Sequence, residues 1–511
     1  MTGGADVRFD ALPAAEPLVH TDVEAPRDQD GLVDLDGVVD ALGGADLLES
    51  ADASGWSYVV PHGRWRLRDD GHRTRLHGPG GLAHDLGPDP FEALERLCAH
   101  LGAVPGARAD PSLPPLTGGL LGVLAYELGS RIERLPTPTN DDRGRDQLAM
   151  RIVEVVCAVP PTREHVLLLA RPLPPSLAGP DGAETSAGAC IEDARRRLGA
   201  AARRRVRADT ARSTVPRPPA QVAWTSLPRA DHLRLIRRVL DAIAAGEVFQ
   251  VNLTQRLSAR WPGDVHTLYR SLREASPAAY GAALPDAGVA SISPETFLRV
   301  EGRAVTTRPI KGTRPRARDA ALDAALADDL ATAGKDRAEN VMVVDLERND
   351  LGRVCRTGSI QVPELTRLQG LPTVWHLVST VRGTLADDVG YGRLLRATFP
   401  SGSITGAPKI AAMTLIGTLE PVRRGAYCGA IGFLSPGQAR LSVAIRTAVL
   451  HGNGEVDHGA GGGIVADSDP VAEHAESLDK AAAFLRAVRA RRVVPAPSRT
   501  TTAPPAPSVR R

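Results

Sequence analysis

The stretch Gly246–Leu257, GEVFQVNLTQRL, largely alternates between apolar and polar side chains, which is the pattern of a β-strand. Its polar face carries Gln250, Asn252 and Thr254, and an amphipathic helix is predicted directly before it, over 231–245. Polar side chains on a strand of a large domain need hydrogen-bonding partners, so this face either meets water or lines a polar cavity. The cavity is favoured, because the sheet of such a domain is usually covered on both sides.

Composition limits the class of protein. The chain has 511 residues, a formal net charge of +2, 42% hydrophobic and 24% charged residues, the balance of a soluble globular protein with about three domains or one large one. The small net charge gives no case for nucleic acid, and no apolar run is long enough to predict a transmembrane helix. The first residues do not resemble a secretory signal. Five widely spaced cysteines without a CxxC pair indicate neither a zinc site nor a disulfide framework, which fits a reducing cytoplasm.

Changes in composition divide the chain into five parts. They are a disordered arm (1–30), an N-terminal region of strands and helices (31–207), a Pro/Ser/Thr-rich linker (208–222), a denser C-terminal region (223–492) and a disordered tail (493–511). The N-terminal region ends in an arginine-rich helix, predicted over 187–207. A solvated helix face explains these arginines better than an RNA-binding arm does, so a nucleic-acid-binding protein is a remote alternative.

The chain uses arginine almost wherever it needs a cation. It contains only four lysines, which are Lys311, Lys335, Lys409 and Lys480. Arginine cannot replace lysine where a compact ammonium or a deprotonatable amine is required. Each of the four is therefore a candidate for work that only lysine can do.

Two predicted helices carry acidic residues three positions apart. One spans about 319–348 and contains Asp336 and Glu339, and the other, near the C-terminus, contains Glu473 and Glu476. Residues at i and i+3 share one helix face. Surface ion pairing is the commonest fate of such acids. The functional interpretation is a site for a hard cation, because Mg²⁺ takes few protein carboxylates together with substrate oxygens and water.

Two glycine-rich stretches, SGSITGAPK (401–409) and GAGGG (459–463), are predicted to be loops that precede helices. Exposed backbone N–H groups at such turns suit anions. Neither stretch matches the phosphate-binding loop or the dinucleotide fingerprint, and a carboxylate ligand would fit as well as a phosphate.

Three titratable residues stand in unusual settings. Lys311 lies in RPIKGTRPR (308–316), a stiff cationic turn whose arginines would lower the lysine pKa, so the amine is either a nucleophile or the partner of an acid. Glu295, just before a predicted strand, is either a general acid or an ordinary solvated carboxylate. His376 is flanked by apolar residues and in isolation is more often a core histidine than a catalyst.

In order along 225–492, the chain resembles the chorismate-utilising enzymes. This family comprises anthranilate synthase component I, aminodeoxychorismate synthase component I, and the isochorismate and salicylate synthases. The stretches that carry the resemblance are GEVFQVNLTQ (246–255), SPETFLRV (293–300), RPIKGTRPR (308–316), KDRAENVMVVDLERNDLGRV (335–354), FPSGSITGAPK (399–409), RGAYCGAIGFLS (424–435), AIRT (444–447) and GAGGGIVADSDPVAEHAESLDKA (459–481). Upstream, LLESA (47–51) and GGLLGVLAYELG (118–129) are similar to the N-terminal region of the two amination branches.

The resemblance implies an α+β fold in which two packed antiparallel sheets are flanked by helices, an αββα sandwich with the active site between the sheets. It implies Mg²⁺ as the cofactor, held between the substrate carboxylate and the metal ligands Glu339 and Glu476. Asp336 and Glu473 would support these ligands as neighbouring acids. The N- and C-terminal regions of the family form one interwoven body, so the boundary between them is one of sequence more than of space.

The resemblance also implies roles for the remaining residues. Glu295 would protonate the departing C4 hydroxyl of chorismate, with Lys311 and His376 as the other catalytic residues. The positions expected to bind substrate are Gln250, Thr313, Thr405, Gly406, Tyr427, Arg446, Gly461, Gly462, Gly463 and Lys480.

Two positions sort the branches of the family. Gln250 stands where the isochorismate and salicylate synthases, which use water, carry a lysine base, and glutamine cannot deprotonate water. Lys311 lies in PIKGT, which is similar to aminodeoxychorismate synthases, whereas anthranilate synthases resemble PIAGT. In the PIKGT branch the lysine is thought to attack C2 as the C4 hydroxyl leaves, and ammonia then adds at C4 without loss of pyruvate. Anthranilate synthase component I is the alternative.

The resemblance further suggests a regulatory site and a partner. LLESA is similar to the tryptophan-binding element of feedback-inhibited anthranilate synthases, which makes Leu48, Glu49 and Ser50 a candidate tryptophan site. No Gly-x-Cys-x-Gly motif surrounds any cysteine, so no glutaminase is expected within this chain. We expect ammonia from a separate glutamine amidotransferase subunit in a heterodimer, and neither nucleic acid nor membrane as a partner.

Overall fold

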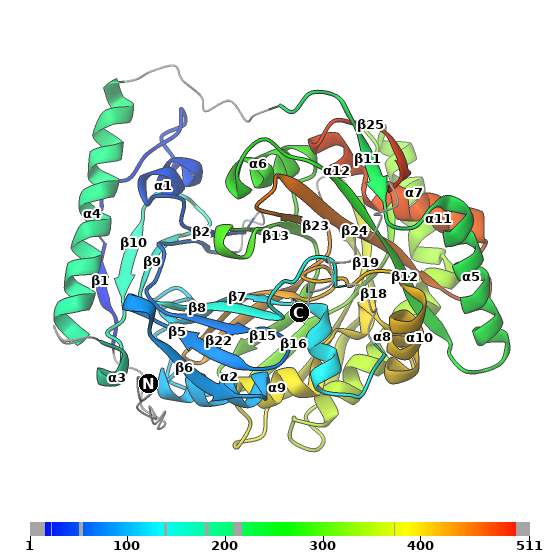
Figure 1. Ribbon diagram of the computed structural model, residues 1–511, viewed down its shortest axis with the longest axis horizontal. Helices are drawn as coiled ribbons and strands as arrows, with labels where there is room; N and C mark the ends of the chain where they lie inside the picture. The colour runs from blue at the N-terminus through cyan, green and yellow to red at the C-terminus, as the bar shows by residue number, and fades with distance from the viewer. Residues whose placement is uncertain are drawn as a thin grey trace, which may run out of the picture.

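The computed structural model describes residues 16–21, 23–50, 55–136, 141–178, 183–207, 217–371 and 374–496. Their strands form two large sheets with helices on the outer sides (Figure 1). Among the described residues, the only parallel pairing in either sheet joins β11 to β25. The expected fold, an α+β sandwich of two largely antiparallel sheets, is therefore confirmed. No helix in this part of the chain combines the length and apolarity needed to cross a membrane.

The first sheet has 13 strands. In spatial order they are β1 (Leu18–His20), β10 (Leu167–Ala170), β9 (Val155–Val159), β3 (Ser57–Val60), β2 (Asp46–Ser50), β13 (Tyr280–Leu284), β14 (Val289–Ser293), β23 (Thr447–Leu450), β24 (Glu455–Ile464), β12 (Gln250–Arg260), β11 (Gln221–Thr225) and β25 (Ala490–Pro495), with β20 (Gly406–Ala407) beside β12. Helices on its outer side are α1 (Leu35–Ala41), α4 (Ala183–Arg207), α6 (Val265–Ala275) and α12 (Ala482–Ala487).

The second sheet has 12 strands. They are β17 (Ile310–Pro315), β19 (Val374–Thr384), β16 (Ala304–Arg308), β15 (Thr296–Glu301), β22 (Gln438–Val443), β21 (Ala430–Ser435), β7 (Gly119–Leu124), β8 (Leu148–Val153), β4 (Arg66–Asp69), β5 (Thr74–His77) and β6 (Ala83–Gly87), with β18 (Gln361–Gly370) beside β19. The other α-helices are α2 (Pro90–His100), α3 (Pro175–Ala178), α5 (Arg229–Ala244), α7 (Ala320–Thr332), α8 (Gly334–Gly352), α9 (Tyr391–Thr398), α10 (Lys409–Leu419) and α11 (Pro470–Lys480).

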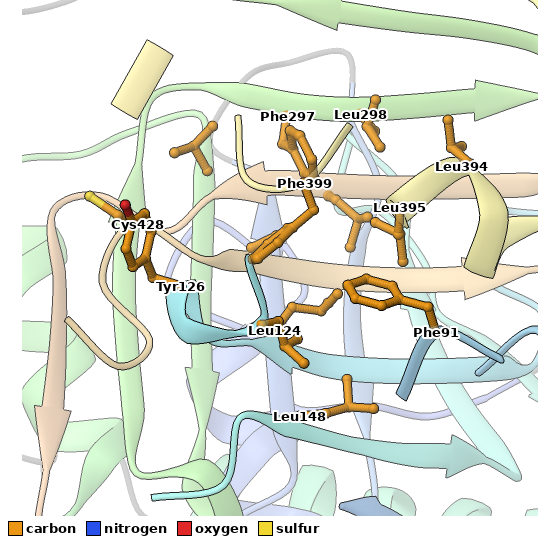
Figure 2. Close-up of a cluster of buried hydrophobic side chains, with 14 of the residues drawn as sticks. Phe91, Leu124, Tyr126, Leu148, Phe297, Leu298, Leu394, Leu395, Phe399 and Cys428 are labelled. Carbon is orange, nitrogen blue, oxygen red and sulfur yellow. The ribbon is translucent and has the colours of Figure 1, made fainter. Parts of the chain in front are cut away.

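Three buried apolar clusters hold these layers together. Between the sheets, Tyr58 of β3 meets Phe433 of β21 edge to face, with ring centroids 5.5 Å apart. On the far side of the second sheet, α2 and α9 bury Phe91 and Leu395 against strand residues such as Leu124 (Figure 2). Burial of aromatic and branched side chains from both layers supplies the main driving force for this stacking.

Both sheets combine strands from the two halves of the sequence. In the first sheet β2 pairs with β13, and in the second β7 pairs with β21. The interwoven body that the sequence predicts is present in this pairing.

Several local predictions differ from the structure. Residues 18–20, placed in the predicted arm, form β1 because their backbone pairs with β10. The ends assigned to the linker and the tail likewise join a sheet, residues 221–222 in β11 and residues 493–495 in β25. The rest of the predicted arm, linker and tail lies partly outside the described residues.

Two further corrections concern the site. The glycine-rich stretch 459–463 is not a loop but part of β24, which pairs with β12 along its length. Lys311 lies in strand β17 and not in a turn, since the chain pairs there with β19 around an irregularity at Gly312, whose φ is +76°. The long helix predicted over 319–348 is two helices, because Ala333 between them has extended backbone.

Candidate active site

The predicted site residues converge where the two sheets meet α8 and α11. The chain passes from β14 of the first sheet to β15 of the second between Ser293 and Thr296, and this crossing carries Glu295. Lys311 comes from β17, while the helices α8 and α11 present Glu339 and Glu476. The site thus draws on both sheets and two helices.

Charged side chains from α8 and α11 gather around β24. The Gln250 amide donates to Glu339 Oε2 at 3.3 Å. Lys480 Nζ lies 2.8 Å from Glu476 Oε1 and donates to Gly461 O at 3.1 Å. Close to this pair, Lys335 Nζ lies 3.3 Å from Glu473 Oε1. These contacts place carboxylates of two separate helices beside one strand.

Gly462 leaves open the space among these charges. A Cβ at this position would lie 3.2 Å from Glu473 Oε2, 3.5 Å from Lys480 Nζ and 3.8 Å from Glu476 Oε1. The side chains of Glu476 and Lys480 are 54% and 45% exposed, so the cluster opens to solvent on this side. The space beside Gly462 is therefore lined by charged side chains and open to solvent.

The two acids that were predicted to bind a metal share their electrostatic surroundings. Burial raises the pKa of Glu339, although Lys311 and Lys335 oppose the rise. Burial also acts upward on the Glu476 pKa, but Lys480, Lys335 and Lys311 outweigh it and the pKa is lowered. Lys311 and Lys335 thus act on both carboxyls, as expected of groups that face one space.

The donors fit a hard cation that completes its shell elsewhere. Within the described residues, no three or more His, Cys, Asp and Glu side chains gather as a metal-binding group. A protein contribution of one or two carboxylates is nevertheless what Mg²⁺ takes when substrate oxygens and water supply the remaining ligands. Asp336 is turned toward Arg314, with 3.4 Å between Oδ2 and Nη1.

Lys311 differs from the other three lysines. Lys335, Lys409 and Lys480 each pair with a carboxylate, whereas Lys311 is the one lysine without an ion pair within 4 Å among the described residues. Its Nζ donates to Ser403 O at 3.3 Å. Burial lowers the Lys311 pKa, and the opposing influence of nearby Glu339, Glu295 and Glu476 does not restore it. A larger share of this amine is therefore unprotonated than in ordinary lysines.

Glu295 is a buried carboxyl beside this amine. It is 4% exposed, and burial raises its pKa to about 7 against the influence of the Ser403 hydroxyl and Lys311. Its Oε1 has no hydrogen-bond partner within the described structure. A carboxyl that holds its proton near neutral pH can donate that proton to a leaving group.

His376 is neutral and presents one unsatisfied nitrogen. Its Nδ1 lies 3.0 Å from Thr313 Oγ1, while the buried Nε2 has no partner in the described part of the chain. Burial lowers the His376 pKa to about 4, and the charge of Arg446 contributes. The ring is therefore an uncharged hydrogen-bonding group close to that arginine.

Other predicted substrate-binding residues have mainly structural contacts. Gly406, with φ +143°, lies so close to Gln250 O that a Cβ would stand 2.1 Å away, and Gly459 is covered in the same way by the ring of Tyr427. The Thr405 hydroxyl donates to Ser401 O at 3.1 Å within its own loop.

The candidate tryptophan residues lie on β2, apart from this cluster. Glu49 accepts hydrogen bonds from Tyr269 at 2.6 Å and from Arg273 at 2.7 Å. Ser50 N donates to Ser57 Oγ at 3.1 Å, and Leu48 packs beside the core between the sheets.

Ser403 and Glu347 were not among the predicted site residues. Ser403 contacts both Lys311 and Glu295, and Glu347, buried on α8, accepts hydrogen bonds from the loop that contains Ser403. In the sequence they are marked only by lying in the stretches SGSITGAPK and DLERND. Neither stretch reveals the contact, because the contact joins two segments that are far apart in the chain.

The fold and the site together define a two-sheet sandwich with a partly buried lysine near carboxylates contributed by two helices. The chain belongs to the family of chorismate binding enzymes, which matches residues 74–486. It is therefore a chorismate-utilising enzyme.

The relatives that it resembles include members of two branches of that family. The chain is 39% identical to aminodeoxychorismate synthase component 1 of Salmonella typhimurium over 398 residues, which cover 77% of this chain and 81% of the relative. It is 40% identical to anthranilate synthase component 1 of Streptomyces coelicolor over 415 residues, 79% of this chain and 78% of the relative. Among solved structures, anthranilate synthase component I of Streptococcus pneumoniae matches with a TM-score of 0.66 and 27% identity, over 85% of this chain and 92% of that one.

Proposed function

We propose that the protein is an aminodeoxychorismate synthase component I, which aminates chorismate at C4 with ammonia to give 4-amino-4-deoxychorismate for p-aminobenzoate. The observation that carries this proposal is the Lys311 amine, which is partly buried, free of ion pairs within the described structure and near enough to Glu295 to affect its pKa. Overall similarity does not separate the branches, since relatives of both kinds are about equally identical to this chain. The PIKGT stretch therefore decides the assignment.

Binding of the substrate dianion would use the cationic side chains and the backbone N–H groups near β24. Lys480, Arg446 and the backbone N–H groups of 461–463 would hold the carboxylates, because each opposes negative charge. Glu339 and Glu476, with Asp336 and Glu473 nearby, would hold Mg²⁺, which when bound would supply positive charge to neutralise a substrate carboxylate. His376 and Tyr427 would line the ring, where an uncharged imidazole can accept a hydrogen bond without repelling Arg446.

The reaction would proceed through Lys311. The unprotonated amine attacks C2 and forms a C–N bond, both ring double bonds shift (C1=C2 and C5=C6 become C1=C6 and C4=C5), and the C4–O bond breaks. Glu295 gives its proton to the departing hydroxyl, which leaves as water. Ammonia then adds at C4, both double bonds shift back, and the C2–N bond breaks to release the lysine. No pyruvate is lost in this sequence.

Ammonia would come from a separate glutamine amidotransferase subunit. The relatives named component 1 support this, because that name implies a second component. Free ammonium would replace the partner in vitro. A chain that yields no glutamine-dependent activity with any candidate amidotransferase would contradict a heterodimer.

One product assay separates the two branches. Purified protein is incubated with chorismate, Mg²⁺ and ammonium at mildly alkaline pH, with and without aminodeoxychorismate lyase. We expect p-aminobenzoate only when lyase is present, no pyruvate without lyase, and no turnover after chelation of the metal. Anthranilate and pyruvate without lyase would instead identify anthranilate synthase component I.

The residues Leu48, Glu49 and Ser50 remain a predicted tryptophan site. Titration of tryptophan against thermal unfolding tests it. We expect a higher melting temperature at saturating tryptophan, since a ligand that binds only the folded state stabilises it. No change at a large excess of ligand would rule the site out.

A further inference from the structure

The loop Ser401–Thr405, called here the serine loop, contacts both groups that the proposed reaction needs. Ser403 O accepts from Lys311 Nζ at 3.3 Å, and the Ser403 hydroxyl lowers the pKa of the Glu295 carboxyl against the effect of burial. Ser403 is 7% exposed, so neither contact competes freely with water. The position of one residue thus sets where the amine and the acid lie relative to each other.

Glu347 accepts hydrogen bonds from the serine loop. The residue is fully buried on α8, and its Oε1 accepts hydrogen bonds from Ser401 Oγ and Gly402 N, both at 3.0 Å. Ser401 Oγ lies in turn 3.1 Å from Ser403 Oγ and accepts from Ser403 N at 3.3 Å. Burying a carboxyl costs free energy unless hydrogen bonds compensate. The bonds from Ser401 and Gly402 offset part of this cost and hold the serine loop in place.

A second contact anchors the same loop on the same helix. Lys409, which begins α10 shortly after the loop, is ion-paired with Asp350 of α8. Its Nζ also donates to Thr398 O at 3.1 Å and to Pro400 O at 2.8 Å, just before the loop begins. Since α8 carries Glu339 two turns upstream, one rigid helix bears both a predicted metal ligand and the anchors of the serine loop.

We infer that Glu347 is a positioning residue, which acts through the serine loop to place Lys311 and Glu295 for reaction. The inference rests on the proposed function for its catalytic meaning, while the placement of Lys311 can be measured whatever the reaction is.

The test follows the reactivity of Lys311 directly. Acetic anhydride is added to the full-length protein, and peptide mass spectrometry gives the acetylation rate of each of the four lysines. In Glu347→Ala we expect the rate at Lys311, relative to half-exposed Lys335, to rise by about tenfold, because the amine loses its carbonyl acceptor and becomes accessible. Glu347→Gln should restore the native rate, since an amide Oε1 can accept the same two hydrogen bonds.

Asp69→Ala is the matched control. Asp69 is also a fully buried carboxyl that accepts one hydroxyl and one backbone N–H, those of Thr74 and Gly71, but it has no contact with the serine loop in the described structure. Its loss should leave Lys311 acetylation unchanged. Should Glu347→Ala not fold, Ser401→Ala removes one of the two hydrogen bonds with little change in volume, and a smaller rise at Lys311 is expected.

Activity provides the second readout. In Glu347→Ala we expect kcat for chorismate amination to fall by at least about tenfold with KM nearly unchanged, because Lys480, Arg446 and residues 461–463, which would hold the carboxylates, lie outside the serine loop. An unchanged acetylation rate at Lys311 in a folded Glu347→Ala or Ser401→Ala protein would overturn the inference. A wild-type enzyme that forms anthranilate would overturn the proposed function instead, and the acetylation result would still stand.

Discussion

At the scale of single residues, Lys311 differs from the other cations of the chain. The chain meets nearly every other need for positive charge with arginine, whose guanidinium stays protonated. Lys335, Lys409 and Lys480 are committed to carboxylates, whereas Lys311 donates to a backbone carbonyl in a buried setting that lowers its pKa. An amine in this state can serve as a nucleophile.

Replacing Lys311 tests the covalent route. In Lys311→Ala we expect kcat for amination at C4 to fall by at least about a thousandfold, because the nucleophile is gone. Lys311→Arg should be equally inactive, since a guanidinium keeps the charge but cannot lose its proton. The measurement is p-aminobenzoate formation in the lyase-coupled assay, with thermal unfolding to confirm that both variants fold. Retention of C4 amination in either variant would exclude the mechanism.

At the scale of elements, the glycines of β24 leave space in the site because they have no side chains. Along 459–463, one face of the strand lies against β12 and Tyr427, and the other is open to the charges of α11. Gly461 and Gly462 are neighbours on opposite faces, so they provide a matched pair of substitutions.

Alanine at Gly462 should mainly lower activity, whereas alanine at Gly461 should mainly lower stability. In Gly462→Ala we expect kcat/KM to fall by about a hundredfold with little loss of stability, because the new methyl group enters the space between Glu473, Glu476 and Lys480. In Gly461→Ala, the Cβ would lie 2.3 Å from Leu253 O, so the strands must separate and stability should fall by about 2 kcal/mol or more. Steady-state kinetics and urea unfolding on both variants check the pair. Equal loss of stability in both would contradict the assignment of faces.

The sequence predicts these elements unequally, and the reason is physical. The strand 248–257 and the acidic faces of α8 and α11 follow from local periodicity, which a single segment contains. The stretch 459–463 was predicted to be a loop because glycine has no intrinsic preference for strands, and its pairing with β12 depends on residues 200 positions away. The link from Glu347 through Ser401 to Lys311 is likewise a tertiary contact, so no local pattern carries it.

At the scale of the whole molecule, the two halves of the chain complete each other. The N-terminal region supplies one contiguous part of each sheet, which meets the C-terminal region at the pairs β2–β13 and β7–β21. Without it, β13 and β21 would become exposed edges, and half of the apolar layer between the sheets would face water.

We therefore expect residues 217–511 expressed alone to aggregate, although they contain every predicted catalytic residue. Co-expression with residues 1–207 should restore a soluble, active complex, because the interface between the fragments is the native core. Size-exclusion chromatography with the chorismate assay measures both results. A monomeric, active 217–511 fragment would show that the sheets do not depend on the N-terminal strands.

The stability of the folded protein should also depend on pH, because buried carboxyls such as Glu295 have raised pKa values. Burial raises the pKa of Glu295 from its ordinary value of 4.5 to about 7, so between these values the folded state binds more protons than the unfolded state. The stability that the protonated form provides is complete below 4.5 and is lost as pH rises through 7. Asp46, Glu127 and Glu347, each with a pKa raised by burial to about 7, add to the same trend.

Glu295→Gln isolates one part of this effect. Glutamine resembles the protonated acid, so at about pH 5 the variant and the wild type should unfold at similar urea concentrations, whereas at about pH 8 the variant should be more stable by about 3 kcal/mol. The same variant should lose activity, because it cannot give up a proton. Glu274→Gln, at an exposed position, is the control and should differ from the wild type equally at both pH values. A variant less stable than the wild type at pH 8 would mean that Glu295 is ionised and paired in the folded protein, and a carboxylate in that state could not protonate the leaving hydroxyl.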